Sequence, residues 1–157
     1  AHTIGTFGKK DKAEYKEGRM VGYRYYDTEE TEVHFCFGHG LSYSHFVYKD
    51  LQLQKEGEEV EISLTVKNDS TVDGKETVQI YVAEKDAKEG EPSHQMKAFE
   101  KIFVKAGEEK LVTFVLTKRD FSHYDVEKHA FVVCGGTYEI QAGTSSRDIF
   151  LRENIRY

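Results

Sequence analysis

Three closely spaced residues late in the chain have the side-chain types of a hydrolytic triad. Ser122, His123 and Asp125 supply a hydroxyl, an imidazole and a carboxylate. A working triad needs these groups to converge from separate elements, and the sequence has no Gly-x-Ser-x-Gly turn to expose a strained nucleophile. We therefore predict no nucleophilic site here. We expect residues 119–124 to form a tight turn between sheets, with Asp120 and Ser122 capping backbone amides.

A second candidate for chemistry is a group of histidines around one cysteine. His34, His39 and His45 lie within twelve residues, with Cys36 among them. Zinc sites in proteins usually combine Cys-x2–4-Cys or His-x3–5-His pairs with a second matching cluster. No such second cluster follows, so the sequence predicts no metal site and no cofactor.

The charge balance of the chain argues against two classes of partner. Its 157 residues include 22 Lys and Arg against 28 Asp and Glu, a formal net charge of −6. Phosphate binding needs clustered basic residues, but the densest basic pieces are two short pairs, at 9–10 and 118–119. No apolar run approaches the roughly 18 residues that span a bilayer. We therefore expect neither nucleic acid nor a membrane as a partner.

Two cysteines, Cys36 and Cys134, are too few for a disulfide framework. The sequence leaves a bond between them open, but free thiols with partial burial fit better. Free thiols slightly favour a reducing compartment such as the cytoplasm. The chain begins Ala-His-Thr, and we expect it to be cut from a longer protein, with the polar residues 1–14 as the tail of a preceding domain.

The elements that must position these residues are predicted from the alternation of apolar and polar side chains. From about residue 46 the pattern is that of β-strands: Val60, Ile62, Leu64 and Val66 share one face of a strand. Polar turns separate the segments. About seven short strands predict an all-β, antiparallel sandwich of immunoglobulin-like type. The segments are 47–54, 60–67, 77–82, 98–105, 112–116, 130–134, 136–142 and 147–151.

Residues 1–45 differ from this pattern and read as an irregular extension, in which residues 15–27 are compatible with a short helix or turn. Segment 35–46 reads FCFGHGLSYSHF and carries two glycines flanked by aromatic residues. This segment, together with those at 15–27, 118–126 and 135–148, resembles the C-terminal end of glycoside hydrolase family 3 enzymes, the β-glucosidases and their relatives. The resemblance covers roughly residues 15–151. It implies a fibronectin type III-like β-sandwich at 46–157, preceded by a connector from a missing α/β domain at 1–45.

The resemblance also implies that the parent is a β-glucosidase-like enzyme acting on O-glycosyl bonds, while this chain alone is inactive. In this family the nucleophile lies in an N-terminal barrel and the acid/base on the following α/β domain, and neither motif matches a position here. A retaining site needs two carboxylates about 5–5.5 Å apart, one of them buried enough to act as an acid. The abundant carboxylates of this chain fall on solvated strand faces and loops: Glu58, Glu59, Glu61, Glu108 and Glu109. We therefore assign no catalytic and no substrate-binding residue.

The partners that the resemblance implies are the catalytic domains of the same polypeptide. In the family, the segments at 15–27 and 35–46 pack between the α/β domain and the sandwich. Glycines there permit close approach, and the apolar side chains can bury area on a partner. The candidate residues of this domain interface are Tyr23, Tyr25, Tyr26, Phe35, Phe37, Gly38, Gly40, Leu41, Tyr43 and Phe46.

One alternative from a different class stays open: an independent carbohydrate- or protein-binding module, since a sandwich fold does not fix function. Exposed aromatic rings could stack on an oligosaccharide and give it a weak contact. The candidate rings are Tyr25, Tyr26, Tyr43, Tyr48 and Tyr81, for which core or interface roles fit better because the chain has no Trp.

Overall fold

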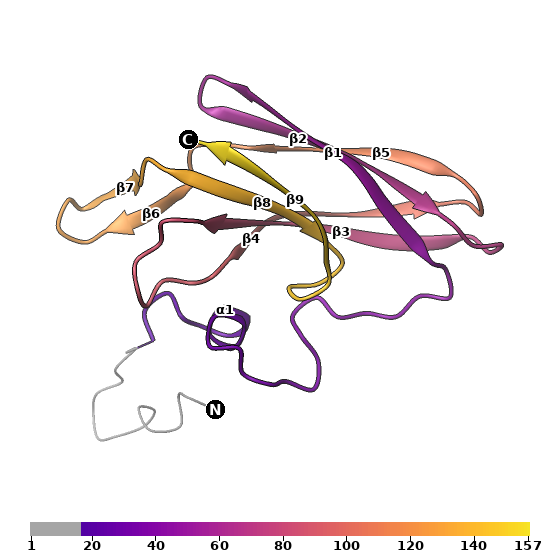
Figure 1. Ribbon diagram of the computed structural model, residues 1–157, viewed down its shortest axis with the longest axis horizontal. Coiled ribbons are helices and arrows are strands. Elements are labelled where there is room, and N and C mark those ends of the chain that lie inside the picture. The colour runs from indigo at the N-terminus through magenta and orange to yellow at the C-terminus, as the bar shows by residue number, and fades with distance from the viewer. Residues whose placement is uncertain (1–16) are drawn as a thin grey trace.

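The computed structural model describes residues 17–157, and the expectation for residues 1–14 lies outside this range (Figure 1). No helix within residues 17–157 is long and apolar enough to cross a membrane. The described elements are one helix, α1 (Tyr23–Thr28), and nine strands: β1 (Phe46–Glu56), β2 (Glu59–Asn68), β3 (Gly74–Glu84), β4 (Gln95–Val104), β5 (Glu109–Leu116), β6 (Ser122–Asp125), β7 (Ala130–Val133), β8 (Thr137–Gly143) and β9 (Ile149–Arg156).

The strands form a two-layer sandwich, as the alternation predicts. One layer has the order β1-β2-β5 and the other β4-β3-β8-β9. All the pairs within the layers are antiparallel. Strands β6 and β7 form a separate hairpin beyond one end of the layers (Figure 1). The prediction of an all-β sandwich with about seven strands is thus confirmed for the two layers, and the hairpin adds two strands.

The core lies between the layers and is made of the side chains that the alternation points inward. In β2, Val60, Ile62, Leu64 and Val66 are fully buried, and each is worth about 1.5–3 kcal/mol relative to an exposed position. The same core includes Val78, Ile80 and Val82 of β3 in the opposite layer, and Val112, Phe114 and Leu116 of β5, which pairs with β2.

A tyrosine closes the corner where the chain enters β8. The Tyr138 hydroxyl donates a hydrogen bond to the Cys134 carbonyl at 2.6 Å, and its ring packs edge-on against Phe121 with centroids 5.2 Å apart. Burial, and next the nearby carboxylate of Glu84, raise the pKa of Tyr138 to about 12. A tyrosine bonded to the backbone just upstream is a recurring feature of immunoglobulin-like sandwiches, where it fixes the crossing between layers.

The region 119–124 differs in part from the predicted turn. A turn does form at residues 118–121, and Asp120 accepts a hydrogen bond from the Thr117 amide at 2.8 Å, as expected. Ser122 instead begins β6, and its hydroxyl donates to the Arg119 carbonyl. The strand was missed because four residues are too few to show an alternation, and their pairing depends on β7.

Candidate domain interface

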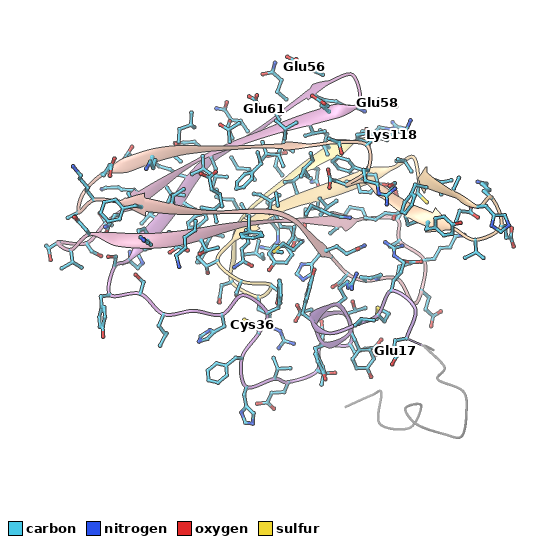
Figure 2. All side chains as sticks on the ribbon, turned by 180° about the vertical axis from the view of Figure 1, so that it is seen from behind. Glu17, Cys36, Glu56, Glu58, Glu61 and Lys118 are labelled. Atoms are coloured by element: carbon cyan, nitrogen blue, oxygen red, sulfur yellow. The ribbon has the colours of Figure 1, made fainter. Side chains whose placement is uncertain are left out.

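The described part of the extension, residues 17–45, lies across the outer face of the layer β4-β3-β8-β9 (Figure 1). Seen from behind, Cys36 lies on this side of the molecule, whereas Glu56, Glu58 and Glu61 project from the opposite layer (Figure 2). The side chain of Glu58 is 67% exposed and pairs with Lys118 at 2.5 Å. These carboxylates are exposed to solvent, whereas a catalytic acid of a glycosidase needs a buried environment.

Aromatic stacking holds the extension on the sandwich. Tyr23, the first residue of α1, stacks on Phe37 with ring centroids 4.4 Å apart and meets Tyr81 of β3 edge-on at 6.2 Å. The Tyr23 hydroxyl accepts a hydrogen bond from the Met96 amide at 2.8 Å, and burial raises its pKa. Tyr81 is 0% exposed and stacks on His94 at 4.9 Å. Because the extension covers it, Tyr81 is buried although it lies on the outer face of its sheet.

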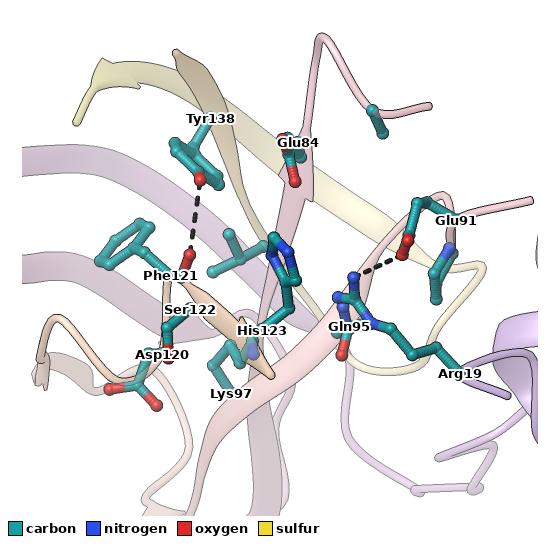
Figure 3. Close-up of a pocket in the computed structure, with 13 residues that line it drawn as sticks. Arg19, Glu84, Glu91, Gln95, Lys97, Asp120, Phe121, Ser122, His123 and Tyr138 are labelled. Carbon is teal, nitrogen blue, oxygen red and sulfur yellow. Dashed lines mark hydrogen bonds and ion pairs between the residues drawn. The ribbon is translucent and has the colours of Figure 1, made fainter. Parts of the chain in front are cut away.

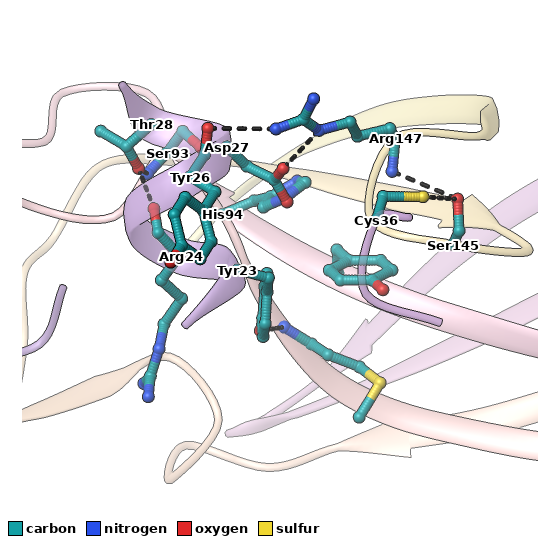
Figure 4. Close-up of polar contacts among 12 residues, drawn as sticks. Tyr23, Arg24, Tyr26, Asp27, Thr28, Cys36, Ser93, His94, Ser145 and Arg147 are labelled. Atoms are coloured by element: carbon teal, nitrogen blue, oxygen red, sulfur yellow. Dashed lines mark hydrogen bonds and ion pairs between the residues drawn. The ribbon is translucent and has the colours of Figure 1, made fainter. Parts of the chain in front are cut away.

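A polar cluster around Asp27 adds a second attachment (Figure 4). Asp27 lies 3.4 Å from His94 Nε2, and His94 Nδ1 lies 2.8 Å from the side-chain oxygen of Gln141 in β8. Burial by itself would raise the pKa of Asp27, but its polar contacts, among them the hydrogen bonds with Arg147 and His94, outweigh it and hold that pKa below its ordinary value. Asp27 is therefore a carboxylate at neutral pH.

Arg147, in the loop between β8 and β9, binds the same stretch of the extension from its other side (Figure 4). Its Nε donates to Asp27 at 2.6 Å, and its Nη2 donates to the carbonyls of Tyr26 and Thr31 at 3.1 and 2.7 Å. The Arg147 guanidinium thus links the end of α1, and the segment that follows α1, to the sheet. Such charge-assisted bonds are about twice as strong as neutral ones.

The extension is attached at a third point by Arg19, near the start of its described part. Arg19 lies in a pocket between β3, β4 and β6 (Figure 3). Arg19 forms an ion pair there with Glu91 of the β3–β4 loop. Burial lowers the pKa of Lys97 in the same pocket. Ser122 and His123 line this pocket, but the Asp125 carboxylate accepts the amides of the β6–β7 turn, so the three residues do not converge as a triad.

The two glycines of segment 35–46 differ in what the structure requires of them. Gly38 has a φ of +83°, and a Cβ there would lie 2.5–2.9 Å from the Gln79 side chain. Gly40 has no neighbour within 4 Å of the corresponding position. Close approach therefore explains Gly38, and nothing in the described structure explains Gly40.

The other candidate interface residues divide between the sandwich and solvent. Phe46 begins β1 and packs against the core, while Tyr25 and Tyr26 are half-buried and meet edge-on at 5.7 Å. Three apolar side chains remain exposed: Phe35 by 73%, Leu41 by 94% and Tyr43 fully. We call these three residues the exposed set.

No sequence pattern points to the residues that attach the extension, namely Asp27, His94 and Arg147. His94 is 67 residues from Asp27, and Arg147 is 120 residues from it. No spacing rule links positions so far apart. Segments 15–27 and 135–148 contain Asp27 and Arg147 and carry the family resemblance, but nothing in them indicates that the two side chains meet.

Comparison with known proteins agrees with the fold. A model described as a fibronectin type III-like domain matches residues 76–146. The thermostable beta-glucosidase B of Acetivibrio thermocellus is 45% identical over 153 residues, which cover 95% of this chain and 20% of that enzyme. An exo-alpha-(1->6)-L-arabinopyranosidase of Bifidobacterium breve is 43% identical over 143 residues, covering 90% of this chain and 19% of that enzyme.

Solved structures match over nearly the whole chain. A glycoside hydrolase family 3 beta-glucosidase from Bifidobacterium adolescentis superposes with a TM-score of 0.94 at 39% identity, covering 98% of this chain and 23% of that one. A beta-glucosidase from Kluyveromyces marxianus in complex with glucose gives a TM-score of 0.90 at 33% identity, covering 94% and 18%. The chain spans about a fifth of the length of the curated relatives it matches.

The strand order and the family model define a β-sandwich of the fibronectin type III-like class. The chain belongs, more narrowly, to the fibronectin type III-like domains of glycoside hydrolase family 3 enzymes, which confirms the resemblance seen in its four segments.

Proposed function

We propose that this chain is a non-catalytic accessory domain of a β-glucosidase-like family 3 glycoside hydrolase, which packs on the catalytic domains and shapes the rim of the active-site cleft. The observation that carries the proposal is the exposed set. Phe35, Leu41 and Tyr43 are large apolar side chains left in solvent on a segment whose neighbours are firmly bound to the sandwich. Exposed apolar groups of this kind mark interaction surfaces.

The attachments of the extension support this role. Because Tyr23, Asp27 and Arg19 fix it at three points, the exposed set is presented on an ordered segment. An ordered surface loses little conformational entropy on binding, so more of the free energy of apolar burial, about 25 cal/mol per Å², appears as affinity.

Complementation tests the proposal. The beta-glucosidase B of Acetivibrio thermocellus, whose matching segment is 45% identical, would be expressed without that segment, and this chain would be added in trans. We expect hydrolysis of an aryl β-glucoside to recover with added chain. The double variant Leu41→Ser, Tyr43→Ser should recover at least tenfold less activity, the effect of losing about 1.4 kcal/mol of binding. Phe99→Ser, which removes a 64% exposed ring from β4, should behave as the unchanged chain.

Failure of complementation together with no binding of the truncated enzyme in ultracentrifugation would contradict the packing role. Hydrolysis of the aryl glucoside by the chain alone would contradict its assignment as non-catalytic.

A weak oligosaccharide contact is the second candidate function, favoured by the full exposure of Tyr43. Titration of the isotope-labelled chain with cello- and xylo-oligosaccharides, followed by two-dimensional NMR, tests it. Localised shifts around Tyr43 that disappear in Tyr43→Ser would support sugar binding. Unchanged spectra at saturating sugar would exclude it.

A further inference from the structure

We propose that Cys36, His39 and Asp148 bind a single zinc ion, and that this ion joins the extension to the β8–β9 loop. Each of the three side chains offers one ligand atom, and these atoms lie within 4.8 Å of one another. The three residues come from two segments more than a hundred positions apart, so only the packing of the extension on the sandwich brings them together. The inference does not depend on the proposed accessory role.

The local backbone places the first two ligands side by side. Cys36 and His39 flank a turn closed by a hydrogen bond from the His39 amide to the Cys36 carbonyl at 3.1 Å. Gly38 supplies the positive φ inside this turn. The turn is held on the sheet because the Ser146 amide donates to the Phe37 carbonyl at 2.8 Å. The imidazole and the thiol therefore lie on the same edge of the extension.

A buried serine connects the third ligand to the first. Cys36 Sγ lies 3.2 Å from the Ser145 hydroxyl oxygen, and that hydroxyl donates to Asp148 at 2.6 Å (Figure 4 shows the first contact). Ser145 is 1% exposed and also accepts the Asp148 amide at 2.9 Å, which fixes the loop. Hydrogen bonds of this kind orient metal ligands and tune their affinity. Ser145 is thus a positioning residue for Asp148, because it donates its one hydroxyl proton to that carboxylate and accepts the Asp148 amide.

The donor set favours zinc. A thiolate, an imidazole and a carboxylate together suit Zn²⁺, whereas Ca²⁺ and Mg²⁺ prefer oxygen ligands alone. Tetrahedral bonds of about 2.3 Å to sulfur and 2.0–2.2 Å to nitrogen and oxygen place ligand atoms about 3.3–3.6 Å apart. The group must therefore contract by roughly 1 Å from its present spread, and His39 and Asp148, both exposed, have the side-chain freedom to do so. Water would complete the fourth position, and the Cys36 thiol would release its proton to solvent on binding.

Cobalt provides the direct test, because Co²⁺ takes the place of Zn²⁺ in tetrahedral thiolate sites and absorbs light. The reduced 157-residue chain would be titrated with CoCl₂ and then with ZnCl₂ in a spectrophotometer. We expect one equivalent of cobalt to give visible bands of a tetrahedral ion and a sulfur-to-cobalt charge-transfer band. One equivalent of zinc should remove both signals.

Matched variants assign the ligands. Cys36→Ser should abolish the charge-transfer band, while Cys134→Ser, which removes the other free thiol, should leave it unchanged. His39→Gln should weaken zinc binding at least tenfold, and His45→Gln, a nearby exposed histidine, should not. Ser145→Ala should weaken it about 10–100-fold, the effect typical of losing a hydrogen bond to a metal ligand. Circular dichroism of the metal-free variants would confirm that each still folds.

A charge-transfer band that survives Cys36→Ser or vanishes in Cys134→Ser would overturn the proposal. So would the absence of any one-to-one signal, or equal loss of affinity in the His39 and His45 variants.

Discussion

At the scale of single residues, this sandwich contains buried polar side chains whose bonds reach from one layer to the other. The Tyr48 hydroxyl of β1 donates to the Glu76 carboxyl of β3 at 3.2 Å, and both residues are buried. Burial raises the pKa of Glu76, although Tyr48, the Thr77 amide and Lys101 act in the opposite direction. Burial also raises the pKa of Tyr48, so that its hydroxyl remains a donor. The glutamate thus gives the two layers a specific contact at the cost of burying an acid.

Glu76→Gln keeps a carbonyl oxygen that accepts the Tyr48 hydrogen bond, and it removes the free-energy cost of burying an ionisable acid. The folded protein holds the Glu76 proton more tightly than the unfolded chain, so this residue's contribution to stability falls as the pH rises from about its ordinary pKa of 4.5 through the raised value. We expect the variant to gain stability relative to the unchanged protein over this range and to be at least as stable at pH 7. Urea unfolding between pH 4 and pH 8 measures the difference. The prediction would be contradicted if the variant were less stable than the unchanged protein by the same free energy at every pH.

Asn68 is a second such residue, at the end of β2. It begins an Asn-Asp-Ser sequence that fits a glycosylation acceptor, yet its side chain is fully buried. Its amide nitrogen donates to the carbonyls of Val72 and Val104 at 2.8 and 3.1 Å, and its oxygen accepts the Ser70 amide. The residue therefore closes a turn at the end of β2.

Asn68→Asp tests this role with almost no change in shape. A carboxylate cannot donate, so the carbonyls of Val72 and Val104 each lose a partner, and we expect a loss of about 2–5 kcal/mol in the free energy of unfolding. Urea denaturation at pH 7 measures it. Asp69→Asn, at the exposed neighbour, serves as control and should change stability by less than about 1 kcal/mol. Equal effects of the two changes would show that the buried bonds are unimportant.

At the scale of elements, the extension and the layer β4-β3-β8-β9 depend on each other. The extension covers Tyr81, which would otherwise expose an aromatic ring on the outer face of β3. Helix α1 has only six residues and no buried residue, so its own helical propensity cannot hold it in place. Its contacts through Tyr23, Asp27 and Arg147 must do so.

Asp27→Asn should loosen the extension while the sandwich remains folded. Because the pKa of Asp27 is lowered in the folded state, its stabilisation is present above its ordinary value of 3.8 and is lost as the pH falls through the lowered value. Hydrogen exchange of residues 23–37, measured by mass spectrometry at pH 7, should speed up in the variant, and the difference should shrink toward pH 3. Glu89→Gln, in an exposed loop, is the control. Unchanged protection of residues 23–37 in Asp27→Asn would contradict this account.

At the scale of the whole molecule, the apolar residues of the core and those of the exposed set have different roles. Those between the layers stabilise the sandwich, whereas the side chains of the exposed set lie mostly in solvent. The same side chain type occurs in both environments, since Leu64 is 0% exposed and Leu41 is 94% exposed.

Leucine-to-alanine changes at these two positions should separate the roles. Leu64→Ala removes buried methyl groups and leaves a cavity, which should cost about 2–5 kcal/mol of unfolding free energy. Leu41→Ala should change that free energy by less than about 0.5 kcal/mol. Chemical denaturation of the isolated chain measures both. A large loss for Leu41→Ala would show that this residue packs within the chain and would weaken the proposed interface.

Much of the sandwich could be predicted from sequence because strand alternation is a local property. Val60 to Val66 and Val78 to Val82 alternate over enough residues to identify both the strands and their inner faces. The four-residue strand β6 was missed because a pattern that short does not stand out from a turn. The family could also be predicted, since its four segments are contiguous stretches of sequence.

The tertiary structure alone determined which side of the extension meets the sheet. Tyr23 turns inward, Phe37 stacks on it while remaining 42% exposed, and Leu41 and Tyr43 turn outward, although all four belong to the same predicted interface. The pairing of Asp27 with Arg147, and the meeting of Cys36 with Asp148, join residues more than a hundred positions apart. Such contacts depend on how the whole chain folds back on itself, and no local pattern of side chains encodes them.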